Sequence, residues 1–97
     1  MEIEIDGKKY ELIKNYKDAF NKEDLEGIIT EYFDNFDYIL GDYAYGKVRL
    51  KGFNEKTNKY FKPINDYSKI DDYIKTSCAY GCKYFILKVQ NPVEKEK

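Results

Sequence analysis

The segment FDYILGDYAYGKVRLKGF, residues 36–53, restricts the fold more than any other part of the sequence. Apolar and aromatic residues recur in two runs, near Phe36–Leu40 and Lys47–Phe53, and in the second run they alternate with Lys47, Arg49 and Lys51. Gly41 and Gly46 bound the residues between these runs. Such runs favour β-strands, while glycine lets the backbone turn sharply at little steric cost. The segment therefore predicts a β-hairpin with a loop of about four to five residues between the two glycines.

A second hairpin is predicted at the N-terminus. The alternating run Glu2–Ile5 leads into Asp6-Gly7, which is a typical two-residue turn. Pairing across that turn would place Ile3 opposite Tyr10 and would give the hairpin one apolar face.

Two helices are predicted from apolar residues three and four positions apart. The first would begin at an Asn21 cap and run to about Phe33. Its buried face would hold four residues, Leu25, Ile28, Ile29 and Tyr32. The second would begin behind a Ser68 cap and run from Lys69 to about Cys78.

The remaining segments complete the predicted fold. Cys82–Val89 is apolar on both faces, which is typical of a central strand. Asn54–Tyr67 is polar, lacks a period and contains a proline, so it predicts a loop with a short extended piece at Tyr60–Ile64. The fold class is α+β: one small domain over residues 1–90, with a mainly antiparallel sheet of about five strands and two helices. Residues 91–97 would form a charged, flexible tail.

Composition agrees with one folded, cytoplasmic domain. Hydrophobic residues make up 42% of the 97 residues, which is too apolar for intrinsic disorder. The first residues, MEIEIDGKK, lack the regions of a signal peptide. No apolar run approaches the roughly 18 residues that a membrane span needs. We therefore expect a soluble protein of the cytoplasm.

Three blocks of sequence carry a family resemblance. They are KKYELIKNYKDAFN at 8–21, the hairpin at 36–53, and DYIKTSCAYGCKYFIL at 72–87. In order and spacing they resemble the YutD-like family, small proteins of low-GC Gram-positive bacteria. The resemblance implies a compact single α+β domain, and it brings no catalytic residues to this chain.

Charge is segregated along the chain although the formal net charge is only −1. Residues 23–46 contain seven acidic side chains and no basic one, whereas residues 47–62 contain six basic side chains and one acidic. The two blocks could neutralise each other through cross-strand pairs such as Asp37 with Lys51. Alternatively, the second block could form a basic face for an anionic partner. The pattern favours neutralisation.

Candidate binding residues gather on the second strand of the central hairpin. Tyr45, Lys47, Arg49 and Lys51 would share one face of that strand. Arg49 is the only arginine in the chain, and a guanidinium offers planar two-point contacts that lysine cannot make. Arg49 could bind a partner, or it could form an ion pair with Asp37 inside the fold. Asp42 is a second possible acceptor.

The tyrosines of the predicted loop have two interpretations. Tyr43 and Tyr45 could project from the loop as an aromatic contact patch. They could equally fold back onto the sheet. With the basic residues Lys47, Arg49 and Lys51, exposed rings would also suit single-stranded nucleic acid, because rings stack on bases and cations follow phosphates.

Cys78 and Cys82, in CAYGC, are separated by three residues. This spacing differs from the redox pattern, and two thiols in a chain without histidine cannot make a four-ligand zinc site. We expect structural cysteines and no metal. A regulatory disulfide is the alternative.

The sequence favours binding over catalysis. Histidine is absent, which removes the commonest general base, and no phosphate-binding or nucleophile motif is present. We therefore expect no enzyme activity and no cofactor. The leading hypothesis is a regulatory or adaptor protein that contacts another protein through Gly41–Gly46 and the Arg49 strand. The alternatives are an RNA or single-stranded nucleic-acid binder using Lys47, Arg49 and Lys51, and a thiol sensor using Cys78 and Cys82.

Overall fold

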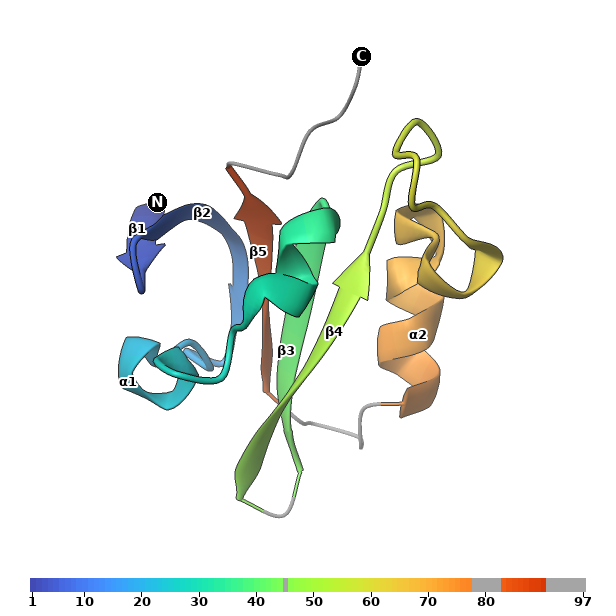
Figure 1. Cartoon of the computed structure of the whole chain (residues 1–97). Coiled ribbons are helices and arrows are strands. Elements are labelled where there is room, and N and C mark those ends of the chain that lie inside the picture. The colour runs from blue at the N-terminus through green and yellow to red at the C-terminus, as the bar shows by residue number, and fades with distance from the viewer. Residues whose placement is uncertain (45, 78–82, 91–97) are drawn as a thin grey trace.

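The computed structural model describes residues 1–44, 46–77 and 83–90. Within them, strands form one antiparallel sheet in the order β1-β2-β5-β3-β4 (Figure 1). The strands are Glu2–Ile5 (β1), Lys8–Tyr16 (β2), Tyr38–Ala44 (β3), Lys47–Phe53 (β4) and Tyr84–Val89 (β5). Strands β1 and β4 are the two edges of the sheet.

Short helical segments connect and cover these strands. The α-helices are Lys22–Leu25 (α1) and Ile70–Ser77 (α2). The 3₁₀ turns are Glu31–Asn35 (η1), Pro63–Asn65 (η2) and Tyr67–Lys69 (η3). The predicted α+β class with an antiparallel sheet is confirmed.

The N-terminal hairpin and the central strand follow the sequence prediction. Ile3 pairs with Tyr10 across the turn, as expected. Asp6 and Gly7 both adopt positive φ, as a tight two-residue turn requires. Strand β5 lies between β2 and β3, and Phe85, Ile86, Leu87 and Val89 are buried on its two faces, which explains why its sequence is mainly apolar; Lys88 is exposed.

The first helix is much shorter than predicted. The side chain of Asn21 caps it by accepting a hydrogen bond from the Glu23 amide at 3.0 Å, but the helix ends at Leu25. Gly27 follows with φ +87°, a conformation that no helix continues through. The expected burial of Tyr32 is wrong, because 67% of it is exposed. Of the other predicted face residues, Leu25 and Ile29 are buried and Ile28 is exposed.

The second helix also begins differently. Asp66, not Ser68, is the capping residue, and its carboxylate accepts from both the amide and the hydroxyl of Ser68. That cap opens η3, which leads directly into α2 at Ile70. The end predicted at Cys78 lies outside the described residues.

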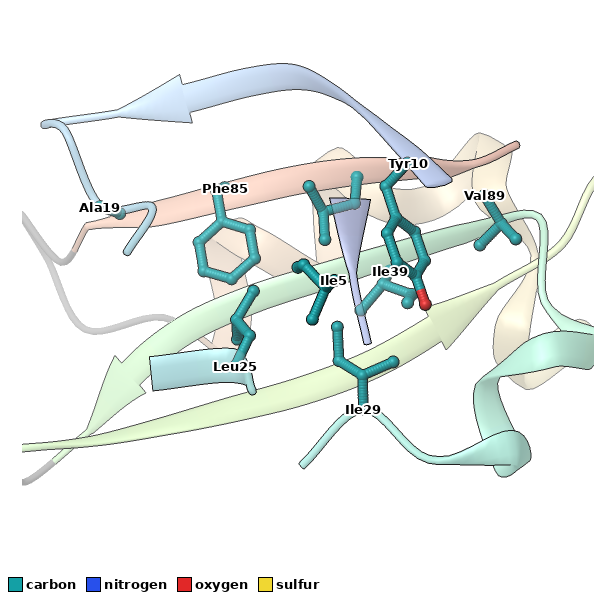
Figure 2. Close-up of a cluster of buried hydrophobic side chains, with 9 residues drawn as sticks. Ile5, Tyr10, Ala19, Leu25, Ile29, Ile39, Phe85 and Val89 are labelled. Carbon is teal, nitrogen blue, oxygen red and sulfur yellow. The ribbon is translucent and has the colours of Figure 1, made fainter. Parts of the chain in front are cut away.

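Both faces of the sheet are covered, so the domain has two apolar clusters. The first lies under the α1 segment and the chain that follows it (Figure 2). It contains nine buried residues, Ile5, Tyr10, Ala19, Leu25, Ile29, Ile39, Phe85, Leu87 and Val89. The second packs against α2 and contains Tyr38, Leu40, Phe53, Ile70 and Ile86. The two clusters therefore cover opposite faces of the central strands β3 and β5.

A buried polar cluster fixes the chain where it leaves β4. Asn54 is fully buried, and its side-chain oxygen accepts from the Asp37 amide at 2.8 Å and from Asn58 Nδ2 at 3.2 Å. The Asp37 carboxylate in turn accepts from the Glu55 amide at 2.9 Å. Asn54 Nδ2 is buried without a hydrogen-bond partner among the described residues, but the other bonds of the cluster fix the position of the following loop relative to β4.

Candidate binding surface around strand β4

The hairpin loop is shorter than predicted. Gly41 to Ala44 belong to β3, where Asp42 pairs with Arg49 and Ala44 pairs with Lys47. The paired residues therefore extend to Ala44 and begin again at Lys47, and Gly46 has φ +78°. Tyr45, one of the predicted contact residues, lies outside the described residues.

Tyr43 folds back against the rest of the domain. Its side chain packs against the first apolar cluster, and its hydroxyl donates to Asp24 Oδ2 at 2.8 Å. Burial, followed by that hydrogen bond and the charge of Asp24, raises the pKa of Tyr43 to about 12. Lys83 Nζ lies 4.6 Å from the centre of the ring. Of the two interpretations of this tyrosine, the structure has the one in which the ring lies on the sheet.

Arg49 forms an ion pair across β3 and β4. Its Nε donates to Asp42 Oδ1 at 3.0 Å and its Nη2 donates to Asp42 Oδ2 at 2.8 Å. The predicted Asp37–Lys51 pair is wrong, because Lys51 lies opposite Leu40 and Asp37 belongs to the buried polar cluster. Neutralisation between the acidic and basic blocks therefore occurs at Asp42.

Lys47, Arg49 and Lys51 lie on the same side of β4 as Phe53, since side chains alternate along a strand. This is the side that α2 covers. The Lys51 ammonium lies 5.2 Å from the centre of the Phe53 ring and 5.4 Å from that of Tyr73 in α2. The basic stripe is thus a border beside a helix and not a broad open sheet face.

The segment after β4 pairs with the sheet edge at one residue. The Asn54 amide donates to the Asn65 carbonyl at 2.7 Å, and the Asn54 carbonyl accepts from the Tyr67 amide at 2.9 Å. This is a parallel bridge between Asn54 and Asp66. The extended piece predicted at Tyr60–Ile64 is therefore wrong, and Asp66, between η2 and η3, forms the bridge to the sheet edge.

The same geometry gives the direction of the backbone groups in β4. The Phe53 carbonyl accepts from the Asp37 amide, on the β3 side. Because successive residues of a strand direct their backbone groups to opposite sides, Gly52, Leu50 and Val48 direct theirs away from β3, as Asn54 does. Within the described residues, β3 is the only strand paired with β4.

A hollow of about 430 Å³ lies beside β4 on the face opposite α2. Its wall is mainly aromatic and aliphatic and comes from η1, β4 and the segment around η2: Tyr32, Phe33, Phe36, Leu50, Tyr60 and Ile64. Gly52 also lines it, and the ring of Phe36 occupies the place of the missing Gly52 side chain. Lys51 and Lys62 add positive charge to the lining.

A second hollow of about 250 Å³ lies on the α2 side of the same strand. It is lined by Asp42, Arg49, Lys51, Tyr73 and two leucines of the hairpin. We call the strand Lys47–Phe53, together with the residues that line these two hollows, the β4 surface. The sequence predicts the cations of the β4 surface. It had not indicated Tyr32 and Ile64, since Tyr32 fitted a helical core period and Ile64 lay in a polar segment.

Over residues 1–44, 46–77 and 83–90, no group of three or more acidic, histidine or cysteine side chains is placed to hold a metal ion. Cys78 and Cys82 lie outside these ranges. None of the helices within the same ranges combines the length and the apolar character needed to cross a bilayer.

Comparisons with known proteins agree with the fold. Residues 4–88 match a family model described as "YutD-like: Putative antitoxin YutD-like". The chain is 40% identical over 86 residues to "Putative antitoxin YutD" of Bacillus subtilis strain 168, which covers 89% of this chain and 94% of the relative. The solution NMR structure of protein yutD from B. subtilis superposes with a TM-score of 0.74 at 36% identity, over 100% of this chain and 88% of that one. The chain therefore belongs to the YutD-like family.

Proposed function

We propose that the chain is a cytoplasmic, non-enzymatic binding protein, a regulatory or adaptor module that holds another protein at the β4 surface. The observation that carries this proposal is the combination of an open sheet edge with a hollow on each side of it. Edge strands present unpaired backbone groups, and adjoining pockets add side-chain selectivity.

Exposed apolar surface is concentrated at this place. In the part of the chain that the structure describes, seven large hydrophobic residues are exposed, and three of them line the larger hollow: Tyr32, Tyr60 and Ile64. Ile64 is 75% exposed and Tyr32 is 67% exposed, the largest values after Met1. Covering such side chains is favourable by about 25 cal/mol per Å² of apolar surface, which supports association with a partner.

The name of the B. subtilis relative, "Putative antitoxin YutD", contains a word for proteins that counteract a toxin. Direct contact with another protein is one way to do so, and this supports a protein as the partner. We place the contact at the edge of β4 and not at the loop Gly41–Gly46, because the hydroxyl of Tyr43 is hydrogen-bonded to Asp24.

A pull-down with matched variants tests the proposal. One variant carries Ile64→Ser and Tyr32→Ser, which remove two exposed side chains of the β4 surface. Its control carries Ile13→Ser and Ile28→Ser, which remove two exposed side chains elsewhere, each 41% exposed. After cross-linking in lysate of the source bacterium, we expect wild type and control to recover one defined protein and the Ile64/Tyr32 variant to lose it.

Two outcomes would contradict this function. Equal recovery by all three proteins would show that the β4 surface does not bind the partner. Recovery of nucleic acid in place of a protein, seen as absorbance at 260 nm that high salt removes, would favour the stripe Lys47, Arg49 and Lys51 as a nucleic-acid site.

A further inference from the structure

Resting on the proposed function, we infer that the partner adds a strand to the sheet at β4. The added segment is extended, and its residues alternate between apolar and acidic. The apolar side chains would enter the hollow beside Leu50 and Gly52, and the acidic side chains would lie along Lys47, Arg49 and Lys51. The hollow on one face of β4 supports the apolar side chains, and the cations on the other face support the acidic ones.

The backbone of β4 is arranged for a neighbour. Val48, Leu50 and Gly52 direct their backbone groups away from β3, and in the described residues no other strand pairs with them. The chain itself already uses the next position, where the Asn54 amide and carbonyl bond the segment 65–67. That segment then turns into η3. Gly52 is buried, so the accessible part of the edge is at Val48 and Leu50, which are half-buried.

The first face selects apolar side chains. A strand placed beside β4 would set every second side chain over the 430 Å³ hollow, next to Leu50, Phe36 and Ile64. The aromatic walls of the hollow match aliphatic or aromatic partners better than charged ones.

The second face selects carboxylates. The intervening side chains of the added strand would lie on the α2 side, directly across from Lys47, Arg49 and Lys51. Residues 47–62 contain six basic side chains against one acidic. Opposite charges across a strand pair are stabilising, and like charges are destabilising, so an acidic strand is favoured over a basic one.

A second copy of this chain fits the edge poorly. Pairing of two β4 strands would bring lysines and arginines face to face. Strand β1 has the sequence EIEI, with the right alternation, but Ile5 is buried and Ile3 is packed against the first cluster of its own domain. The isoleucines of β1 are therefore not available to the hollow of another copy.

The test uses a synthetic nine-residue peptide that alternates glutamate and valine, with both ends blocked. It is titrated into the full chain labelled with ¹⁵N, and amide chemical shifts are followed. We expect the largest changes at Val48, Leu50 and Gly52. Methylating alternate peptide nitrogens on the bonding edge should weaken binding at least about tenfold, since two or more backbone hydrogen bonds are lost.

Charge and groove are tested with further peptides and variants. Replacing every glutamate of the peptide by lysine should abolish binding. Lys47→Glu should weaken the glutamate peptide several-fold, while Lys14→Glu, on β2, should not. Ile64→Ser should weaken binding and Ile28→Ser should not, with amide dispersion confirming that each variant is folded.

Several outcomes would overturn strand addition: shift changes that map away from β4, insensitivity to nitrogen methylation, or equal binding of the lysine peptide. Concentration-dependent dimerisation through β4, or displacement of the peptide by a nine-nucleotide oligo-dT, would assign the edge to a second copy or to nucleic acid. If the pull-down recovers a protein at the β4 surface and the peptide arms fail, strand addition is wrong and the binding function stands. If recovery does not depend on Ile64 and Tyr32, the proposed function itself is wrong.

Discussion

Arg49 donates two hydrogen bonds to the carboxylate of Asp42, which is nearly buried. Only 5% of the Asp42 side chain is exposed, against 49% of the Arg49 side chain. Arg49→Ala would leave this carboxylate without its guanidinium, and we expect a loss of about 1–3 kcal/mol in the free energy of unfolding. Arg49→Lys should lower the free energy of unfolding by less, because lysine keeps the positive charge but cannot make the second hydrogen bond to Asp42.

Urea unfolding of wild type and both variants measures these losses. Lys47→Ala, an exposed position of the same strand, serves as the control and should change stability by less than about 0.5 kcal/mol. Wild-type stability for Arg49→Ala would contradict a structural role for the pair and would return Arg49 to partner binding alone.

Two glycines are expected to differ in their tolerance of alanine. A Cβ at Gly41 would overlap the ring of Phe85, which is fully buried in the central strand, whereas a Cβ at Gly52 would overlap the ring of Phe36 at the edge of the larger hollow. Overpacking a core costs about 1–3 kcal/mol, and Phe85 has no space to move into. Gly41→Ala should therefore lower the melting temperature more than Gly52→Ala. The reverse order would show that Phe36 is the more rigidly held ring.

The buried amide of Asn58 should be important for stability. Its Nδ2 lies 3.2 Å from both Asp37 Oδ1 and Asn54 Oδ1, so Asn58→Ala removes the donor that these buried oxygens share. We expect a loss of about 1–3 kcal/mol in chemical unfolding. Lys59→Ala, at the exposed next position, should be silent. Equal stability of the two variants would mean that the polar cluster contributes nothing measurable.

Tyr43 should make part of the stability depend on alkaline pH. Its pKa is about 12 in the fold and about 10 in an unfolded chain, so folding favours the protonated phenol. The stabilisation is complete below pH 10 and is lost as pH rises from about 10 to about 12. Tyr43→Phe lacks this group, so the stability gap between wild type and variant should narrow over that range. A gap that stays constant from pH 8 to pH 11.5 would contradict the Tyr43–Asp24 hydrogen bond.

Local chemistry explains which sequence predictions are confirmed. Asp6-Gly7 supplies the positive φ values of a two-residue turn, and the turn then fixes Ile3 opposite Tyr10. Strand β5 carries apolar residues on both faces, apart from Lys88, which is typical of a central strand with two covered faces. Neither inference needed knowledge of residues far away in the chain.

The site could be predicted only in part. Alternation placed Lys47, Arg49 and Lys51 together, and Asp42 was one of two acceptors considered for Arg49. The sequence could not choose between Asp37 and Asp42, because a shift of one residue in register exchanges the two faces of a strand. Tyr32 has the spacing of a buried helical residue. The helix nevertheless ends before Gly27, and Tyr32 is exposed.

The sequence by itself determined the existence of the strands, the turn at Asp6-Gly7 and the cap at Asn21, because each depends on residues close together in the chain, and it identified the family. The tertiary structure decided what each face of the sheet is used for. Because α2 packs on the side of β4 that carries Lys51, this lysine lies beside Tyr73 at the border of a hollow. The hydroxyl of Tyr43 bonds Asp24, so its ring lies on the sheet and does not project from the hairpin. The hollow at the edge of β4 is built by η1, β4 and the η2 segment, which meet only when the chain is folded, since no local pattern encodes their distance.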